Sequence, residues 1–72
     1  MQFEHNIASA RKKAKLSQAV VAKEMKMKLR TYQAKESGER AMSASEGITF
    51  SIITNVEAKK IDFRKEAQKN LS

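Results

Sequence analysis

The sequence predicts an all-α fold, a compact domain of five short helices. The chain has 72 residues, the length of one small domain, so its core must be compact and built from a few short helices. Apolar residues recur at helical spacing in its first third, and serine or glycine stands where helices would begin or end. Because no repeat, linker or low-complexity tract divides it, residues 1–72 are interpreted as a single domain.

A first amphipathic helix is expected over about residues 3–14. Its apolar stripe follows i, i+4, i+7 and i+11 spacing and would lie on the core. The residues of the stripe are Phe3, Ile7, Ala10 and Ala14. The only histidine, His5, stands beside Glu4 and is expected on the solvent side of this helix, not as a metal ligand or a catalytic base.

A second helix is expected from about Gln18 to Met25. Ser17 is a good N-cap, because its hydroxyl can accept a hydrogen bond from a free amide of the first turn, and Leu16 precedes it as a hydrophobic staple. The residues expected to be buried are Val21, Ala22 and Met25.

A third helix is expected from about Leu29 to Glu36, with Tyr32 as its core contact. The "SG" that ends in Gly38 supplies its C-terminal stop. Only "KMK" (residues 26–28) separates it from the second helix, and the small Ala22 stands where the two helices would cross closely. Two short helices joined in this way form a helix-turn-helix pattern.

The chain beyond the third helix admits two interpretations. "SASE" (residues 43–46) is a capping box and favours a fourth helix from about Ala44 to Thr54, and the helix-friendly "FRKEAQKNL" (residues 63–71) favours a fifth. Against this, "ITFSIIT" (residues 48–54) alternates apolar and polar residues and is rich in β-branched side chains, and "KIDF" (residues 60–63) places two apolar residues two apart. Both patterns are typical of β-strands. The alternative is therefore three or four helices followed by a C-terminal β-hairpin.

The positive charge is concentrated in one part of the chain. The formal net charge is +7, and the segment from Arg11 to Arg40 holds ten basic residues against three acids, while the remaining segments hold five of each sign. This distribution favours a polyanionic partner, and nucleic acid is the first candidate. The alternative is a basic face that is merely solvated.

Several other classes of function are not expected. There is no cysteine, so disulfides and thiolate metal sites are excluded, and no cofactor or metal is expected. No serine has a base partner recognisable in the sequence, so an enzyme is not expected. The first residues lack the apolar core of a signal peptide, and no run approaches the roughly 18 apolar residues of a membrane span. A cytoplasmic, nucleoid-associated protein is expected.

"LSQAVVAKEM" followed by "RTYQAKESGER" resembles the Cro and lambda-repressor-like helix-turn-helix family of phage and bacterial regulators, over Arg11 to Arg40. The resemblance implies a five-helix lambda-repressor-like domain, or a Cro-like α+β domain if the hairpin forms. It implies a sequence-specific regulator of transcription, a phage or bacterial repressor that binds double-stranded DNA with residues 29–36 in the major groove. Gln18 and the helix start at Ser17 would touch phosphate, and Arg11 would form an ion pair with Glu36.

Three residues depart from the family pattern. Lys26 stands where glycine is usual, so a left-handed backbone there would carry a side-chain penalty. Lys28 stands where serine or threonine usually caps the recognition helix, which loses a cap and puts a cation at the wrong end of the helix dipole. Lys35 falls where an apolar residue usually packs.

Side-chain chemistry assigns roles on the third helix. Arg30 and Gln33 lie on one side of it and can make paired hydrogen bonds, Arg to guanine and Gln to adenine. Lys28 could reach bases or the backbone, and Leu29 and Ala34 could contact a thymine methyl, although Leu29 could equally be structural. The remaining predicted phosphate contacts are Arg11, Lys12, Lys13, Lys26 and Arg40.

A homodimer is expected, at least on DNA, because one short helix reads too few base pairs. Its surface should come from the apolar residues of the last third, unless all of them complete the core. These residues are Ile48, Phe50, Ile52, Ile53, Val56, Ile61 and Phe63. The alternative function is a protein-interaction module in which Leu29 and Val20 meet a partner protein, one that modulates another regulator.

Overall fold

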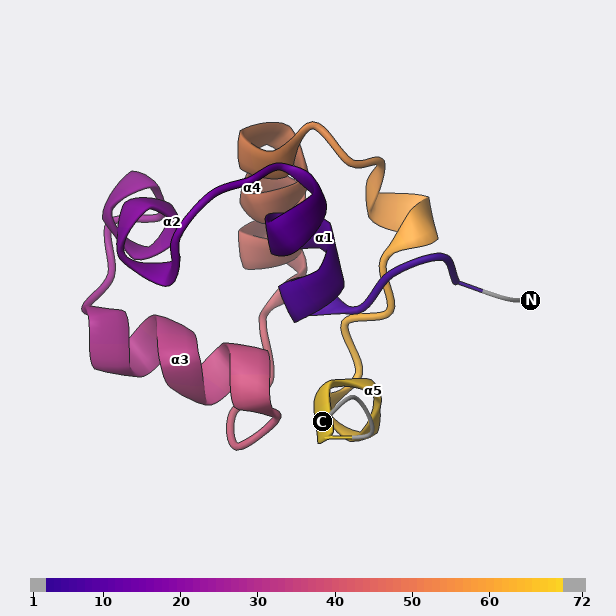
Figure 1. Cartoon of the computed structure of the whole chain (residues 1–72). Coiled ribbons are helices and arrows are strands. Elements are labelled where there is room, and N and C mark those ends of the chain that lie inside the picture. Colours follow the sequence, from indigo (N-terminus) through magenta and orange to yellow (C-terminus); the bar gives the residue numbers. More distant parts are fainter. Residues whose placement is uncertain (1–2, 70–72) are drawn as a thin grey trace.

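The computed structural model describes residues 3–69, which form five α-helices and one turn of 3-10 helix, η1 (Figure 1). The helices are α1 (Ile7–Lys13), α2 (Gln18–Glu24), α3 (Leu29–Ser37), α4 (Ala44–Thr54) and α5 (Lys65–Lys69), and η1 spans Ala58–Lys60. The five-helix, all-α prediction is confirmed. The hairpin alternative is wrong, because residues 48–54 lie inside α4.

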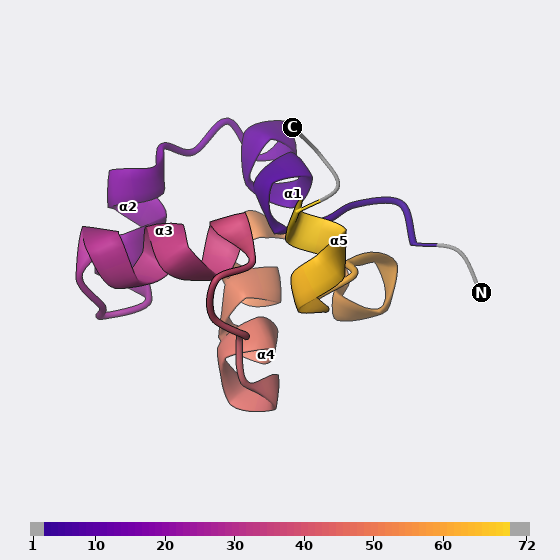
Figure 2. The ribbon, with the colours of Figure 1, turned by 90° about the horizontal axis from the view of Figure 1, so that it is seen from below.

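The helices are arranged around a small centre. Figure 1 shows α3 lying across the view while α2 is seen nearly end-on, so the two helices cross instead of running alongside each other. In Figure 2, α1 and α4 lie on opposite sides of α3, and α5 packs beside the end of α3. No helix within residues 3–69 has both the length and the apolar composition to cross a membrane.

The core is assembled from all parts of the chain. Its buried apolar residues are Ile7, Ala10, Val21, Ala22, Tyr32, Met42, Phe50, Val56 and Ile61. Tyr32 of α3 stacks on Phe50 of α4 with ring centroids 6.5 Å apart, and Phe63 meets Phe50 edge-on. The core contacts predicted on α2 and α3 are confirmed, with Met25 only partly buried against the cluster.

Local caps fix most helix boundaries. Ser17 Oγ accepts from Val20 N, and Ser43 and Glu46 form a reciprocal capping box at the start of α4. Gly38 ends α3 in the left-handed region, with φ +87°. Since each cap satisfies backbone groups that the helix itself leaves free, these boundaries agree with the predictions made from the same residues.

The prediction that the first helix starts at residue 3 is wrong. The helix begins at Ile7, because the side chain of Asn6 caps it by accepting from Ser9 N at 2.8 Å. The preceding segment is not helical and bends at Glu4, and the amides of Glu4 and His5 both donate to the Lys60 carbonyl. Phe3 is 39% exposed and outside the helix.

Because His5 lies in this non-helical segment, it is not on a helix surface. It forms an isolated β-bridge with Ile61, and its Nδ1 lies within hydrogen-bond distance of Ser9 Oγ. Of the fifth helix expected over residues 63–71, α5 covers Lys65–Lys69, and Asn70 and Leu71 lie outside the described residues.

Candidate nucleic-acid interface

The turn between α2 and α3 holds two lysines in local conformations that favour other residues. Lys26 has φ +58°, in the left-handed region that glycine adopts without penalty. Lys28 is the N-cap of α3, and no side-chain hydrogen bond caps the helix there. The two departures noted in the sequence therefore have the geometry expected of them, and both lysines are exposed.

The outer face of α3 carries most of the predicted base-reading residues. Leu29, Arg30 and Gln33 are exposed, as is Lys28 immediately before the helix, whereas Ala34 is only partly exposed. The opposite face is buried. Ser37 is also exposed one turn beyond Gln33; sequence reasoning used it only in the stop of the third helix and gave it no binding role, although the i+4 spacing would have indicated one.

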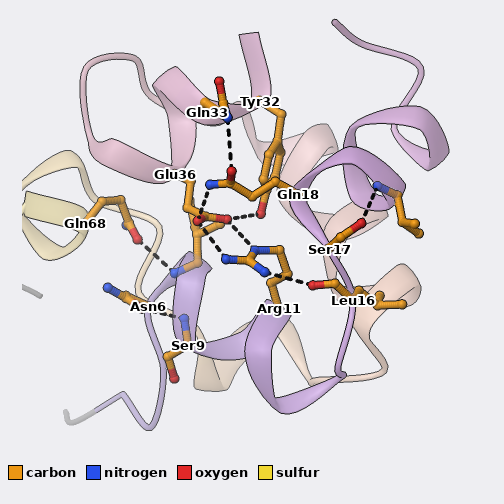
Figure 3. A network of polar contacts seen from close by, with 12 residues as sticks. Asn6, Ser9, Arg11, Leu16, Ser17, Gln18, Tyr32, Gln33, Glu36 and Gln68 are labelled. Atoms are coloured by element: carbon orange, nitrogen blue, oxygen red, sulfur yellow. Dashed lines mark hydrogen bonds and ion pairs between the residues drawn. The ribbon is translucent and has the colours of Figure 1, made fainter. Parts of the chain in front are cut away.

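Gln18 at the start of α2 is joined to Gln33 on α3. Gln33 Nε2 donates to Gln18 Oε1 at 3.0 Å, and Gln18 Nε2 donates to Glu36 Oε1 at 2.9 Å (Figure 3). This chain of hydrogen bonds orients the amide of Gln33. It leaves Gln33 Oε1 and the second Nε2 hydrogen directed away from Gln18, which is the donor and acceptor pair that an adenine edge needs.

Beneath these glutamines lies the predicted ion pair between Arg11 of α1 and Glu36 of α3. Arg11 Nε donates to Glu36 Oε2 at 2.8 Å, Nη2 donates to Oε1 at 3.1 Å, and Nη1 donates to the Leu16 carbonyl (Figure 3). Tyr32 donates its hydroxyl to Glu36 Oε2. The prediction is confirmed, and the pair is largely buried, with 12% and 9% of the two side chains exposed.

The pKa values follow from this network. Burial would raise the pKa of Glu36, but hydrogen bonds from Arg11, Tyr32 and Gln18 outweigh it, so the pKa is lowered. The hydrogen bond to Glu36 raises the pKa of Arg11, and burial followed by the same carboxylate raises the pKa of Tyr32. Glu36 therefore stays ionised, with its charge balanced by Arg11.

Most cations of the basic segment are exposed and make no ion pair within residues 3–69. Only Arg11 and Lys35 of the ten are paired there. The other eight, all exposed, are Lys12, Lys13, Lys15, Lys23, Lys26, Lys28, Arg30 and Arg40. The predicted phosphate contacts Lys12, Lys13, Lys26 and Arg40 are thus accessible, whereas Arg11 is mostly committed inside the protein.

One hollow of about 420 Å³, here called the polar hollow, brings several of the predicted residues together. It is lined by Ala8, Lys12, Gln18, Gln33, Glu36, Ser37, Gln68 and Lys69. Lys13 does not border it and lies instead at a separate depression with Leu16 and Asn55. Residues of α5 were given no role from the sequence, yet two of them line the polar hollow.

Lys35, which falls where relatives of the resembled family have an apolar residue, is accommodated by an ion pair. Its Nζ donates to Glu46 Oε1 at 2.8 Å and to the Ala41 carbonyl, and its side chain is 11% exposed. The hydrogen bond from Lys35 lowers the pKa of Glu46. Lys35 therefore packs its aliphatic stem and joins α3 to the capping box of α4.

Among residues 3–69, no three His, Asp or Glu side chains are grouped so that they could hold a metal ion. No protein-family model, curated protein or solved structure matches the chain.

Proposed function

We propose that this protein is a sequence-specific, double-stranded DNA-binding regulator of transcription, a phage or bacterial repressor of the Cro and lambda-repressor-like type that acts on the nucleoid. The observation that carries the proposal is the set of eight exposed cations between Lys12 and Arg40 that have no ion-pair partner within residues 3–69. A face that was merely solvated would gain from interspersed acids, since like charges repel. Duplex phosphates supply the missing negative charge.

Helix α3 is the reading element in this proposal. Arg30 and Gln33 are exposed on its outer face, and the bond from Gln33 to Gln18 limits how the Gln33 amide can turn. A preorganised amide loses less side-chain entropy when it binds a base. Arg30 would read guanine and Gln33 adenine, with Leu29 against a thymine methyl.

The remaining polar residues would hold the backbone. Lys12 and Gln18 border the polar hollow beside α3, while Lys26, Lys28 and Arg40 extend from the segments before and after that helix. Phosphate contacts of this kind fix register and orientation without reading sequence. Arg11 supports them indirectly, because it holds Glu36 and so Gln18 in place.

A second copy would complete the site. At nine residues, α3 is about 13.5 Å long at about 1.5 Å per residue, so one protomer can read only a few base pairs. Of the apolar residues proposed for a dimer surface, only Ile48 and Ile52 are largely exposed, at 58% and 73%. Both lie on α4, whose single charged residue, Glu46, is paired with Lys35. This is a face on which two basic copies would repel each other least.

The alternative, a protein-interaction module, is favoured by the exposure of Val20 and Leu29, at 45% and 42%. A mobility shift on duplex DNA across salt concentrations separates the two. If about six phosphates are neutralised, affinity should fall on the order of a thousandfold between about 50 and 200 mM salt. Binding that ignores salt, or no binding at low salt, rejects the DNA proposal.

A further inference from the structure

The C-terminal helix α5 lies against the end of α3 and against α1 (Figures 1 and 2). It is a short helix, Lys65–Lys69, which would not be stable alone. Its position is instead fixed by contacts with residues far away in the sequence. Those contacts decide which of its side chains faces the rest of the molecule.

Gln68 provides the strongest of these contacts. Its buried side chain accepts from Ile7 N at 2.8 Å and donates to the Asp62 and Arg64 carbonyls at 2.7 and 2.6 Å. It therefore satisfies one of the free amides at the start of α1 while it closes the turn into α5. Asn6 adds a longer hydrogen bond to the Ala67 carbonyl.

Gly38 sets the fit between α5 and α3. A Cβ at this position would lie 2.6 Å from the Lys65 carbonyl oxygen and 2.8 Å from Lys69 Cγ, closer than atoms can pack. The same residue ends α3 with φ +87°. Lys69 is thus brought to the C-terminal end of α3 by a glycine that α3 also needs for its cap.

The charge of the polar hollow is positive once its internal pair is taken into account. The charged residues that line it are Lys12, Glu36 and Lys69, and Arg11 neutralises Glu36. Lys12 and Lys69 are exposed and make no ion pair within residues 3–69. Two free ammonium groups among polar side chains make a surface suited to an anionic oxygen.

We propose that α5 is part of the DNA-binding surface, and that Lys69 neutralises a backbone phosphate of the duplex beside the C-terminal end of α3. This rests on the proposed function and extends it to a part of the chain that lies outside the basic segment. Lys12 of α1 and Lys69 of α5 would both bind backbone phosphates at the polar hollow, while α3 enters the major groove.

The test compares Lys69→Ala with Lys65→Ala in the full-length protein. Both lysines are exposed, unpaired within the described residues and on the same helix, but only Lys69 lines the polar hollow. Affinity for a duplex is measured as a function of salt, and the slope of log affinity against log salt is compared. Removing one phosphate contact should reduce that slope by about 0.9.

We expect this reduction for Lys69→Ala, equally on preferred and random duplexes, with an almost unchanged slope for Lys65→Ala and recovery in Lys69→Arg. Equal slopes for the two alanine variants would overturn the inference, because the effect would then reflect net charge alone. If the unaltered protein fails to bind any duplex at low salt, the proposed function itself fails. Circular dichroism of each variant checks that the helices are retained.

Discussion

Replacing Lys28 by serine should make the protein more stable and weaken its binding to DNA. Lys28 is the N-cap of α3, yet no side chain caps the helix there. A serine would accept a hydrogen bond from a free amide, worth about 1 kcal/mol, and would remove a cation from the positive end of the helix, worth about 0.3–1 kcal/mol. The gain of about 1–2 kcal/mol should raise Tm by roughly 4–8 °C for each kcal/mol in a domain of this size.

Lys26→Gly acts by a different route in the same direction. At φ +58°, a non-glycine residue costs about 1–2 kcal/mol, and the greater freedom of glycine in the unfolded chain offsets about 0.4–1 kcal/mol of the relief. The net gain is therefore between about 0 and about 1.6 kcal/mol. In both Lys28→Ser and Lys26→Gly, the slope of log affinity for DNA against log salt should also decrease by about 0.9, because each variant removes one proposed phosphate contact.

Lys15→Gly is the matched control for this pair. Lys15 has φ +61°, so Lys15→Gly should stabilise the protein as Lys26→Gly does. Because no phosphate contact is assigned to Lys15, the variant should keep more of the salt slope of DNA binding. Thermal denaturation and binding titrations on the same samples measure both quantities. If Lys26→Gly and Lys28→Ser are more stable but bind DNA with an unchanged salt slope, neither lysine contacts phosphate and their assignment to the DNA backbone is refuted.

Four further predictions concern base reading, the buried ion pair, its dependence on pH and the proposed dimer. Arg30→Ala and Gln33→Ala should each cost roughly 1–3 kcal/mol on the preferred site and little on random DNA; equal losses in a competition titration would make them backbone contacts. Arg11→Ala should cost about 3–5 kcal/mol in chemical denaturation, because it strands the buried Glu36 carboxylate. Because the pKa of Glu36 is lowered in the folded protein, its ionisation contributes fully to stability above its ordinary pKa, about 4.3. That contribution is lost as pH falls through the folded pKa. In Glu36→Gln, Tm should therefore decrease less as the solution is made acidic. Ile52→Lys should abolish a two-protomer complex in sedimentation with a palindromic duplex; Thr49→Lys, also exposed on α4, controls for added charge, and one protomer at saturation in the unaltered protein would end the dimer hypothesis.

The parts of the fold that the sequence predicted well are those decided by neighbours in the chain. The start of α4 followed from the capping box of Ser43 and Glu46, whose two hydrogen bonds span only three residues. The end of α3 followed from Gly38 in the same way. A local rule is sufficient where both partners of the interaction lie within one turn.

Most of the parts that were missed depend on residues distant in the sequence, but the start of α1 does not depend on them alone. It was placed too early because the apolar stripe fits Phe3 and because Asn6 was overlooked as a local N-cap. Contacts from Lys60 and Gln68 then fix the residues around it. Likewise, Lys35 and Glu46 were each noticed, one as a departure and one as a cap, but no spacing rule joins them. Their pairing appears only once α3 and α4 are packed together.

The contacts between α3 and α4 have a consequence for the proposed dimer. Tyr32 stacks on Phe50, and Lys35 pairs with Glu46, so α3 is joined at two places to the helix that presents Ile48 and Ile52. A two-fold contact through α4 would therefore fix the separation of the two α3 helices. The separation required on DNA is the roughly 34 Å between successive major-groove half-sites. Lys35→Met keeps the apolar stem of the side chain but removes the ion pair with α4. This variant should weaken the preference for one half-site spacing more than it reduces affinity for a single half-site.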